Sequence, residues 1–256
     1  MHNRKQQLEA IERLLDILDD LREKCPWDKK QTFESLRNLT IEEVFELADS
    51  IDTRNTEELK KELGDVLLHI LFYAKIGSEQ NLFDIKTVAD GICEKLIFRH
   101  PHIYGNVSVK NEKEVKENWE KLKIKEGNTS VLGGVPNSLP SIIKAYRIQE
   151  KAAGVGFDWT EKREVWAKVE EELSEFKTEE ARQDLEKMEE EFGDVLFSLI
   201  NYARFSGIDP DKALSKTNAK FIMRFQSIEQ EAQKTGKNIA DLSIEQMNEI
   251  WNRFRS

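Results

Sequence analysis

The sequence predicts an all-α protein made of two related helical units in tandem. Apolar residues recur at intervals of three and four in nearly every long segment, as on the buried face of a helix. No segment alternates convincingly at the two-residue period of a strand. The chain contains only 12 Gly and 5 Pro among 256 residues, so few positions interrupt a helix. One acidic pattern also occurs twice, 129 residues apart, which indicates an internal duplication.

The apolar stripes predict the helices in chain order. In the first half they define helices over 8–21, 33–51, 59–76, 88–98 and 115–122. In the second half they define helices over 142–152, 165–176, 185–205, 213–228 and 244–254. Shorter breaks that contain Pro or Gly fall at 25–28, 100–105 and 154–159.

A change in composition separates the two units. Residues 127–140 include three glycines and two prolines, which break helices and favour turns. We therefore expect an N-terminal helical domain over 1–126, a Gly/Pro linker over 127–140 and a C-terminal helical domain over 141–256.

Composition narrows the classes of function. The chain is 39% hydrophobic and 34% charged, as expected of a folded protein with many solvated helix faces. Its net charge of -10 argues against binding polymeric nucleic acid. The most apolar stretch, 66–74, is interrupted by His69 and is far shorter than the ~20 residues of a membrane span. A polar N-terminus and only two cysteines, Cys25 and Cys93, favour the cytoplasm, with both thiols reduced.

The duplicated pattern is Glu-Glu-x-x-Glu, then fifteen residues, then Glu-x-x-Asp. Carboxylates three residues apart share one face of a helix, and a turn between the helices would make the two pairs converge. Converging carboxylates repel one another unless they are protonated or hold a cation. Oxygen-only ligands suit Mg²⁺, with Mn²⁺ as a substitute. The predicted ligands are Glu172, Glu175, Glu191 and Asp194, and in the first copy Glu43, Glu46, Glu62 and Asp65.

Basic and aromatic residues follow each acidic pattern. Lys220 and Arg224 are four residues apart, as are Trp251 and Arg255. A cationic pair beside a metal site suits a polyphosphate, and a Trp face suits a base. The first-copy counterparts are Lys95, Arg99, Trp119 and Lys123. Taken singly, each of these residues also fits an ordinary role, as a solvated cation or a core Trp.

Several motifs together resemble a known family. They are CPWD at 25–28, both acidic patterns, RHPH at 99–102, SVL at 130–132, GVP at 134–136, QEKAA at 149–153 and VGFDW at 155–159. With this ordered set, nearly the whole chain resembles the MazG nucleoside triphosphate pyrophosphohydrolases of the all-α NTP pyrophosphatase superfamily. The resemblance implies cleavage between the α- and β-phosphates, which yields a nucleoside monophosphate and pyrophosphate. It also implies a homodimer, with four-helix metal sites completed by dimerisation.

The resemblance extends to individual residues. It implies that Lys168 and Lys187, with Lys220 and Arg224, contact the triphosphate, and that Trp251 contacts the base or ribose. In the first copy the positions of Lys168 and Lys187 hold Leu39 and Glu58. Because a triphosphate carries nearly four negative charges, the absence of two cations should weaken substrate binding or transition-state stabilisation in the first copy. We therefore expect the C-terminal copy to be the main catalyst.

The expected mechanism is in-line hydrolysis with magnesium, in which water attacks the α-phosphorus. Glu171 is the candidate proton acceptor, beside the metal-binding Glu172 and Glu175. A di-iron carboxylate protein is one alternative, but such sites use Glu-x-x-His pairs, and the pairs here end in Asp65 and Asp194. A non-catalytic helical binding module is the second alternative.

Overall fold

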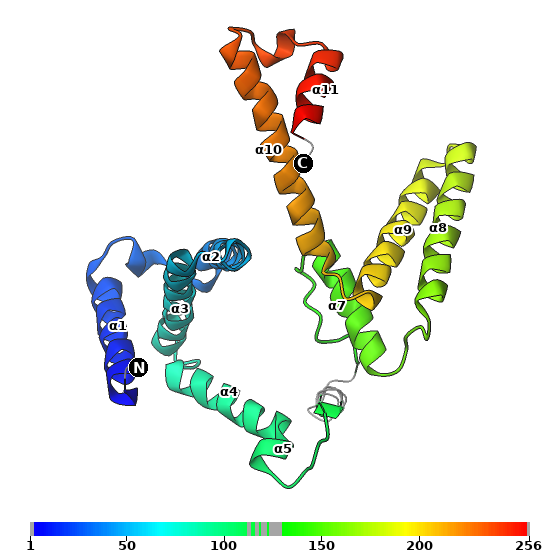
Figure 1. Ribbon diagram of the computed structural model, residues 1–256. Coiled ribbons are helices and arrows are strands. Elements are labelled where there is room, and N and C mark those ends of the chain that lie inside the picture. Colours follow the sequence, from blue (N-terminus) through cyan, green and yellow to red (C-terminus); the bar gives the residue numbers. More distant parts are fainter. Residues whose placement is uncertain (1–2, 112–113, 116–117, 119–121, 123–129, 255–256) are drawn as a thin grey trace. The chain divides into compact units, whose positions relative to one another are not determined.

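The computed structural model describes residues 3–111, 114, 115, 118, 122 and 130–254. Every regular element within these ranges is a helix, which confirms the all-α prediction (Figure 1). The chain divides into two compact units, Met1–Ser108 and Val109–Ser256. Residues 130–140 of the expected linker form turns and bends, whereas 127–129 and most of the expected helix 115–122 lie outside the described residues. The domain limits at 126 and 141 therefore stay predictions.

The first unit is a helical hairpin supported by a preceding helix. Helices α2 and α3 pack against each other, α1 packs on α3, and α4 follows α3 and contacts α5. The elements are α1 (Arg4–Lys24), η1 (Asp28–Lys30), α2 (Phe33–Thr53), α3 (Thr56–Glu79), α4 (Ile85–Arg99) and α5 (Pro101–Tyr104). The core is a cluster of five buried side chains from α1, α2 and α3: Leu18, Leu36, Leu71, Phe72 and Ile76. Removing these side chains from water is the main favourable term that holds the three helices together.

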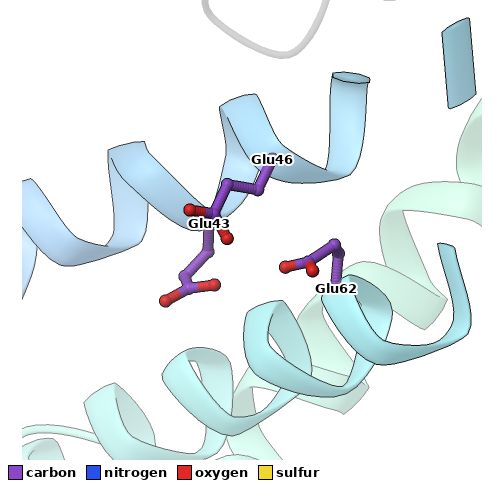
Figure 2. A group of neighbouring side chains, drawn as sticks. All are labelled: Glu43, Glu46 and Glu62. Atoms are coloured by element: carbon purple, nitrogen blue, oxygen red, sulfur yellow. The ribbon is translucent and has the colours of Figure 1, made fainter. Parts of the chain in front are cut away.

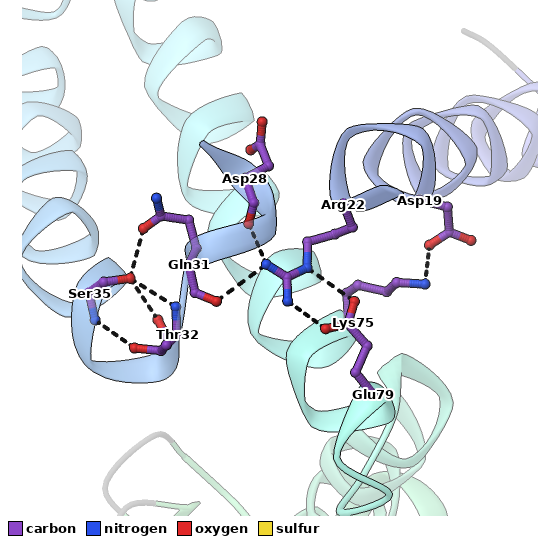
Figure 3. Close-up of polar contacts among 8 residues, drawn as sticks. All are labelled: Asp19, Arg22, Asp28, Gln31, Thr32, Ser35, Lys75 and Glu79. Carbon is purple, nitrogen blue, oxygen red and sulfur yellow. Dashed lines mark hydrogen bonds and ion pairs between the residues drawn. The ribbon is translucent and has the colours of Figure 1, made fainter. Parts of the chain in front are cut away.

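One arginine ties the loop after α1 to the end of α3 (Figure 3). Arg22 Nε donates to Glu79 Oε1 at 3.0 Å, and Nη2 donates to the other oxygen of the same carboxylate. Nη1 donates to the Gln31 carbonyl at 3.2 Å and to the Asp28 carbonyl. Backbone carbonyls that leave water need such donors. Arg22 thus holds the 25–31 loop against the end of α3, and Thr32 then caps the start of α2.

The second unit repeats the hairpin and extends it. Helices α8 and α9 run side by side (Figure 1), while α7 and α10 both pack on α9. The elements are α7 (Ser141–Gly154), α8 (Lys162–Arg182), α9 (Leu185–Phe205), α10 (Pro210–Lys234), η2 (Ile239–Asp241) and α11 (Ile244–Arg253). Within the described residues, α11 contacts α10 alone.

The two hairpins turn in the same way. Arg54 ends α2 in the left-handed region with φ 55°, and the Asn55 side chain then accepts the Glu58 N–H at the start of α3. Gln183 ends α8 with φ 57°, and the Asp184 side chain accepts the Lys187 N–H at the start of α9. A two-residue connection makes the helices of each pair antiparallel, so the turn sets the register of the acidic side chains. No helix in the described part of the chain is long and apolar enough to cross a membrane.

Candidate metal and nucleotide site

The first hairpin brings three carboxylates together, as the sequence predicts. Glu43 and Glu46 extend from α2 and Glu62 extends from α3 (Figure 2). Each offers an oxygen within 4.8 Å of the others. Such spacing allows one cation to touch all three groups, since divalent ions bind oxygen at about 2–2.6 Å.

The convergence of these carboxylates is electrostatically unfavourable in itself. Glu62 is only 3% exposed, and its Oε2 is buried with no hydrogen-bond partner in the described structure. Loss of hydration raises the pKa of Glu43, and the Asp65 charge adds to the increase. Loss of hydration likewise raises the pKa of Glu46, with Glu62 as the main charged neighbour. Both effects oppose ionisation, and a bound cation would offset them.

The second hairpin repeats the cluster with Glu172 and Glu175 on α8 and Glu191 on α9. Their closest oxygens also lie within 4.8 Å of one another. Glu172 is buried, at 6% exposed. Loss of hydration raises the pKa of Glu191, followed by the charges of Glu175 and Asp194. The duplicated sequence therefore folds into a duplicated set of converging carboxylates.

The fourth predicted ligand of each copy lies beside this group rather than within it. Asp65 is half-buried on α3, and Asp194 is exposed on α9, each one turn beyond the cluster glutamate of its helix. Both still act through space, because Asp65 raises the pKa of Glu43 and Asp194 raises that of Glu191. In each copy the structure thus brings three of the four predicted ligands into one group, with the aspartate adjacent.

A lysine lies against the second cluster. Lys168 Nζ is 2.8 Å from Glu171 Oε1 and 2.8 Å from Glu172 Oε1. These contacts, that with Glu171 first, raise the pKa of Lys168, so the ammonium stays charged. The candidate proton acceptor Glu171, a predicted ligand and a predicted phosphate contact are therefore neighbours. A cation at this place can reach the same phosphate oxygens as a metal ion held by the carboxylates.

Comparison with known proteins agrees with this geometry. Residues 31–104 and 161–228 match the MazG nucleotide pyrophosphohydrolase domain. These segments include both acidic hairpins and make up more than half of the chain. The chain belongs to the MazG family. The resemblance inferred from its motifs is thereby confirmed.

MazG relatives align over nearly the full length. The nucleoside triphosphate pyrophosphohydrolase/pyrophosphatase MazG of Thermotoga maritima is 43% identical over 250 residues, covering 96% of this chain and 95% of that protein. The nucleoside triphosphate pyrophosphohydrolase of Escherichia coli K12 is 38% identical over 257 residues, which cover 97% of this chain and 98% of that protein. The uncharacterized Bacillus subtilis protein YabN is 47% identical over 235 residues, which cover 90% of this chain and 48% of that protein.

The downstream cations of this MazG chain lie on other helices. The Arg224 guanidinium stands 5.3 Å from the centre of the Trp251 ring, and its Nε donates to the Phe254 carbonyl at 3.1 Å. Phe221 packs edge-on against the Trp251 ring, with 5.1 Å between the ring centres. Arg224 and Trp251 thus join α10 to α11, and Lys220 is exposed on α10. In the described residues α11 contacts only α10, so the acidic cluster and Trp251 are not brought together through α11.

The remaining predicted contacts are only partly described. Lys187 is exposed in the first turn of α9. Lys95 is exposed on α4, and Arg99 is half-buried at the end of that helix. Trp119, Lys123 and Arg255 lie outside the described residues.

The sequence pattern missed a cation in the first copy. Lys61 Nζ lies 3.3 Å from Glu62 Oε1 and 3.5 Å from Glu58. Neighbouring residues on a helix do not normally face each other, so spacing gave no signal for the contact with Glu62. Lys61 also lines an open hollow of about 290 Å³ beside the cluster; its other lining residues are Glu46, Asp49, Ser50, Thr53, Glu58 and Glu62. The first copy therefore holds one lysine near its carboxylates, although Leu39 and Glu58 replace the two predicted ones.

Proposed function

We propose that the chain hydrolyses nucleoside triphosphates, with magnesium, to a nucleoside monophosphate and pyrophosphate at the second acidic hairpin. The observation that carries this proposal is the convergence of Glu172, Glu175 and Glu191 from two paired helices beside Lys168. Family membership and the names of the two full-length relatives support the same reaction.

The donor set fits a hard divalent cation. In the described residues neither acidic cluster includes a histidine or cysteine, so every available ligand atom is a carboxylate oxygen. The same chemistry argues against a di-iron site, which uses Glu-x-x-His pairs. Glu62 Oε2 of the first copy is a buried acceptor that has no partner among the described residues. Magnesium suits such oxygen ligands, and manganese is the closest substitute.

Different side chains have different roles around the phosphates. When bound, magnesium would neutralise phosphate oxygens and lower the pKa of a coordinated water. Lys168, Lys187, Lys220 and Arg224 are the cations assigned to the triphosphate. Water attacks the α-phosphorus, the bond to the bridging oxygen breaks, and pyrophosphate leaves with that electron pair. Glu171 accepts the water proton through the oxygen that Lys168 leaves free.

A homodimer completes the proposal. Each acidic hairpin contributes only two helices, whereas a bundle core needs apolar surfaces on both sides. Several large apolar residues of α8, α9 and α10 are exposed, namely Leu173, Phe192, Leu196, Leu199 and Phe221. A second copy of the chain that covers this surface would complete a four-helix core. Light scattering of the purified chain tests this part, and a monomer at working concentration would exclude it.

The second copy is proposed to be the main catalyst. Lys168 and Lys187 have no counterpart at positions 39 and 58, and Lys61 supplies only one cation to the first copy. One fewer positive group at a triphosphate weakens transition-state stabilisation.

The test is to incubate the full chain with ATP or dGTP and magnesium and to identify the products. Monophosphate plus pyrophosphate is expected. Glu172→Gln should reduce kcat at least about 100-fold, because a metal ion supplies several kcal/mol of stabilisation. Glu43→Gln, at the matching position of the first copy, is the control and should retain most activity. Release of orthophosphate would indicate a different phosphohydrolase, no turnover would favour a binding module, and equal losses would refute the ranking of the two copies.

A further inference from the structure

In each acidic hairpin, residues that face each other across the two helices form pairs, which we call layers. Two layers consist of carboxylates, and a third layer lies next to them, nearer the turn. On one face of a helix, successive residues are three or four positions apart. Because α8 and α9 are antiparallel, each residue on this face of α8 lies opposite one on α9, and the numbers rise along α8 as they fall along α9. The second copy gives the pairs Glu172 with Asp194, Glu175 with Glu191, and Glu179 with Lys187. The first copy gives Glu43 with Asp65, Glu46 with Glu62, and Ser50 with Glu58.

The first copy supports this register. Ser50 and Glu58 line the same hollow as Glu46 and Glu62, so the second and third layers are adjacent in space. Because both hairpins have the same turn and the same spacing, we expect Glu179 and Lys187 at the equivalent place in the second copy. Both members of the third layer differ between the copies, from Ser and Glu to Glu and Lys.

Glu179 is a buried carboxylate with one unused oxygen. It is 8% exposed, and its Oε1 accepts a hydrogen bond from Arg182 Nη1 at 2.6 Å. Its Oε2 is buried and has no partner in the described structure. Burying a polar oxygen without a partner is costly, so a donor group that reaches this oxygen would stabilise the site.

In this register, Lys187 on α9 is the basic residue opposite Glu179 on α8. Its backbone N–H is held by Asp184 Oδ1 at 3.3 Å, which fixes the start of the side chain at the first turn of α9. In the described part of the chain its ammonium makes no ion pair, and the side chain is exposed. A second metal ion at Glu179 is disfavoured, because Arg182 and Lys187 already bring two positive charges to this end of the hairpin.

We propose that Glu179 is a positioning residue for Lys187: once a nucleotide is bound at the carboxylate cluster, the buried Oε2 of Glu179 accepts a hydrogen bond from the ammonium and directs the ammonium to the phosphate chain. The inference rests on the proposed function, since it gives Lys187 a phosphate to bind. It assigns a role to a carboxylate outside the acidic pattern. It also explains why Glu179 and Lys187 are both absent from the first copy.

A double-mutant cycle tests the proposal on the full chain. Glu179→Gln and Lys187→Met are each expected to raise KM for ATP about tenfold, the size of one charge-assisted hydrogen bond, with kcat changed less than about threefold. The double variant should be no worse than Lys187→Met alone, because Glu179 acts only through the lysine. Glu179→Asp should recover part of the affinity, and Ser50→Ala at the matching first-copy position should change nothing.

Binding of the magnesium complex of inorganic triphosphate to the four proteins of the cycle gives a second readout that needs no turnover. Coupled losses of affinity support the role of Glu179. Independent losses, in which Glu179→Gln weakens binding as much without Lys187 as with it, would overturn it. A thermal melt identifies a variant that is merely unfolded, and Glu179→Asp then carries the comparison. Failure of the wild type to release pyrophosphate would count against the proposed function, whereas additive losses with normal turnover would count against Glu179 alone.

Discussion

Replacing Arg22 with Met should destabilise the first unit about twice as much as removing the charge of its partner, Glu79. The Arg22 side chain is 10% exposed and the Glu79 side chain is 38% exposed, so the ion pair itself is partly screened and contributes about 1 kcal/mol. Arg22→Met also leaves the Gln31 carbonyl without its donor, at about 1 kcal/mol, whereas the Asp28 carbonyl loses one of two donors and keeps the Gln31 N–H at 3.1 Å. The total loss is therefore about 2 kcal/mol, against about 1 kcal/mol for Glu79→Gln.

Urea unfolding followed by circular dichroism measures both losses, with each unit allowed its own transition. Lys75→Met is the matched control, because Lys75 makes a more exposed 2.8 Å ion pair with Asp19 and should cost at most about 0.5 kcal/mol. Equal losses for the Arg22 and Glu79 variants would refute the role assigned to the Gln31 carbonyl.

The ion pair between Arg22 and Glu79 makes the stability of the first unit depend on pH. The hydrogen bond from Arg22 lowers the pKa of Glu79 below its usual value. A carboxyl whose pKa is lower in the folded state stabilises the fold above the unfolded pKa and loses that contribution as the pH falls through the folded pKa. The stability difference between wild type and Glu79→Gln should therefore shrink on acidification below about pH 4. A difference that stays constant down to pH 2 would contradict this assignment.

Three further predictions concern the site and the core. Lys168→Leu, which installs the first-copy residue, should lower kcat/KM about 30- to 100-fold by removing a cation beside Glu172, whereas Leu39→Val should change it less than about twofold. The raised pKa values of Glu43, Glu46 and Glu191 mean that these groups stabilise the metal-free fold at low pH and lose that contribution as the pH rises through the folded pKa. Magnesium should accordingly raise Tm more at pH 8 than at pH 5, and equal shifts would refute the link. Leu36→Ala should cost about 2–5 kcal/mol in urea unfolding, since Leu36 is fully buried in the first core.

The helices and the meeting of the acidic pairs could be predicted from sequence because both follow from local spacing. The three-and-four periodicity locates α2, α3, α8 and α9, and carboxylates three residues apart must share a helix face. Because the acidic pattern occurs twice with the same spacing, we interpret it as a metal site rather than as a solvated helix face. Glu43, Glu46 and Glu62 do converge, as the spacing predicts, and their binding of a metal ion stays a prediction.

Features that depend on register across the hairpin could not be predicted in this way. The register is set by turns whose left-handed residues are Arg54 and Gln183 rather than glycine, so composition gave no signal for them. Glu179 lies outside the acidic pattern, and its buried oxygen is visible only in three dimensions. Arg224 and Trp251 were expected at the nucleotide, and spacing alone gave no indication that they pack on each other. Their contact with a nucleotide stays a prediction.

The central claim is that paired helices hold a divalent cation between converging carboxylates, once in each copy. Mn²⁺ titration of the full chain, followed by electron paramagnetic resonance of the free ion, measures this directly. We predict binding at both hairpins, loss of one site in Glu62→Gln, loss of the other in Glu191→Gln and loss of both in the double variant. Undiminished Mn²⁺ binding by the double variant would contradict the claim.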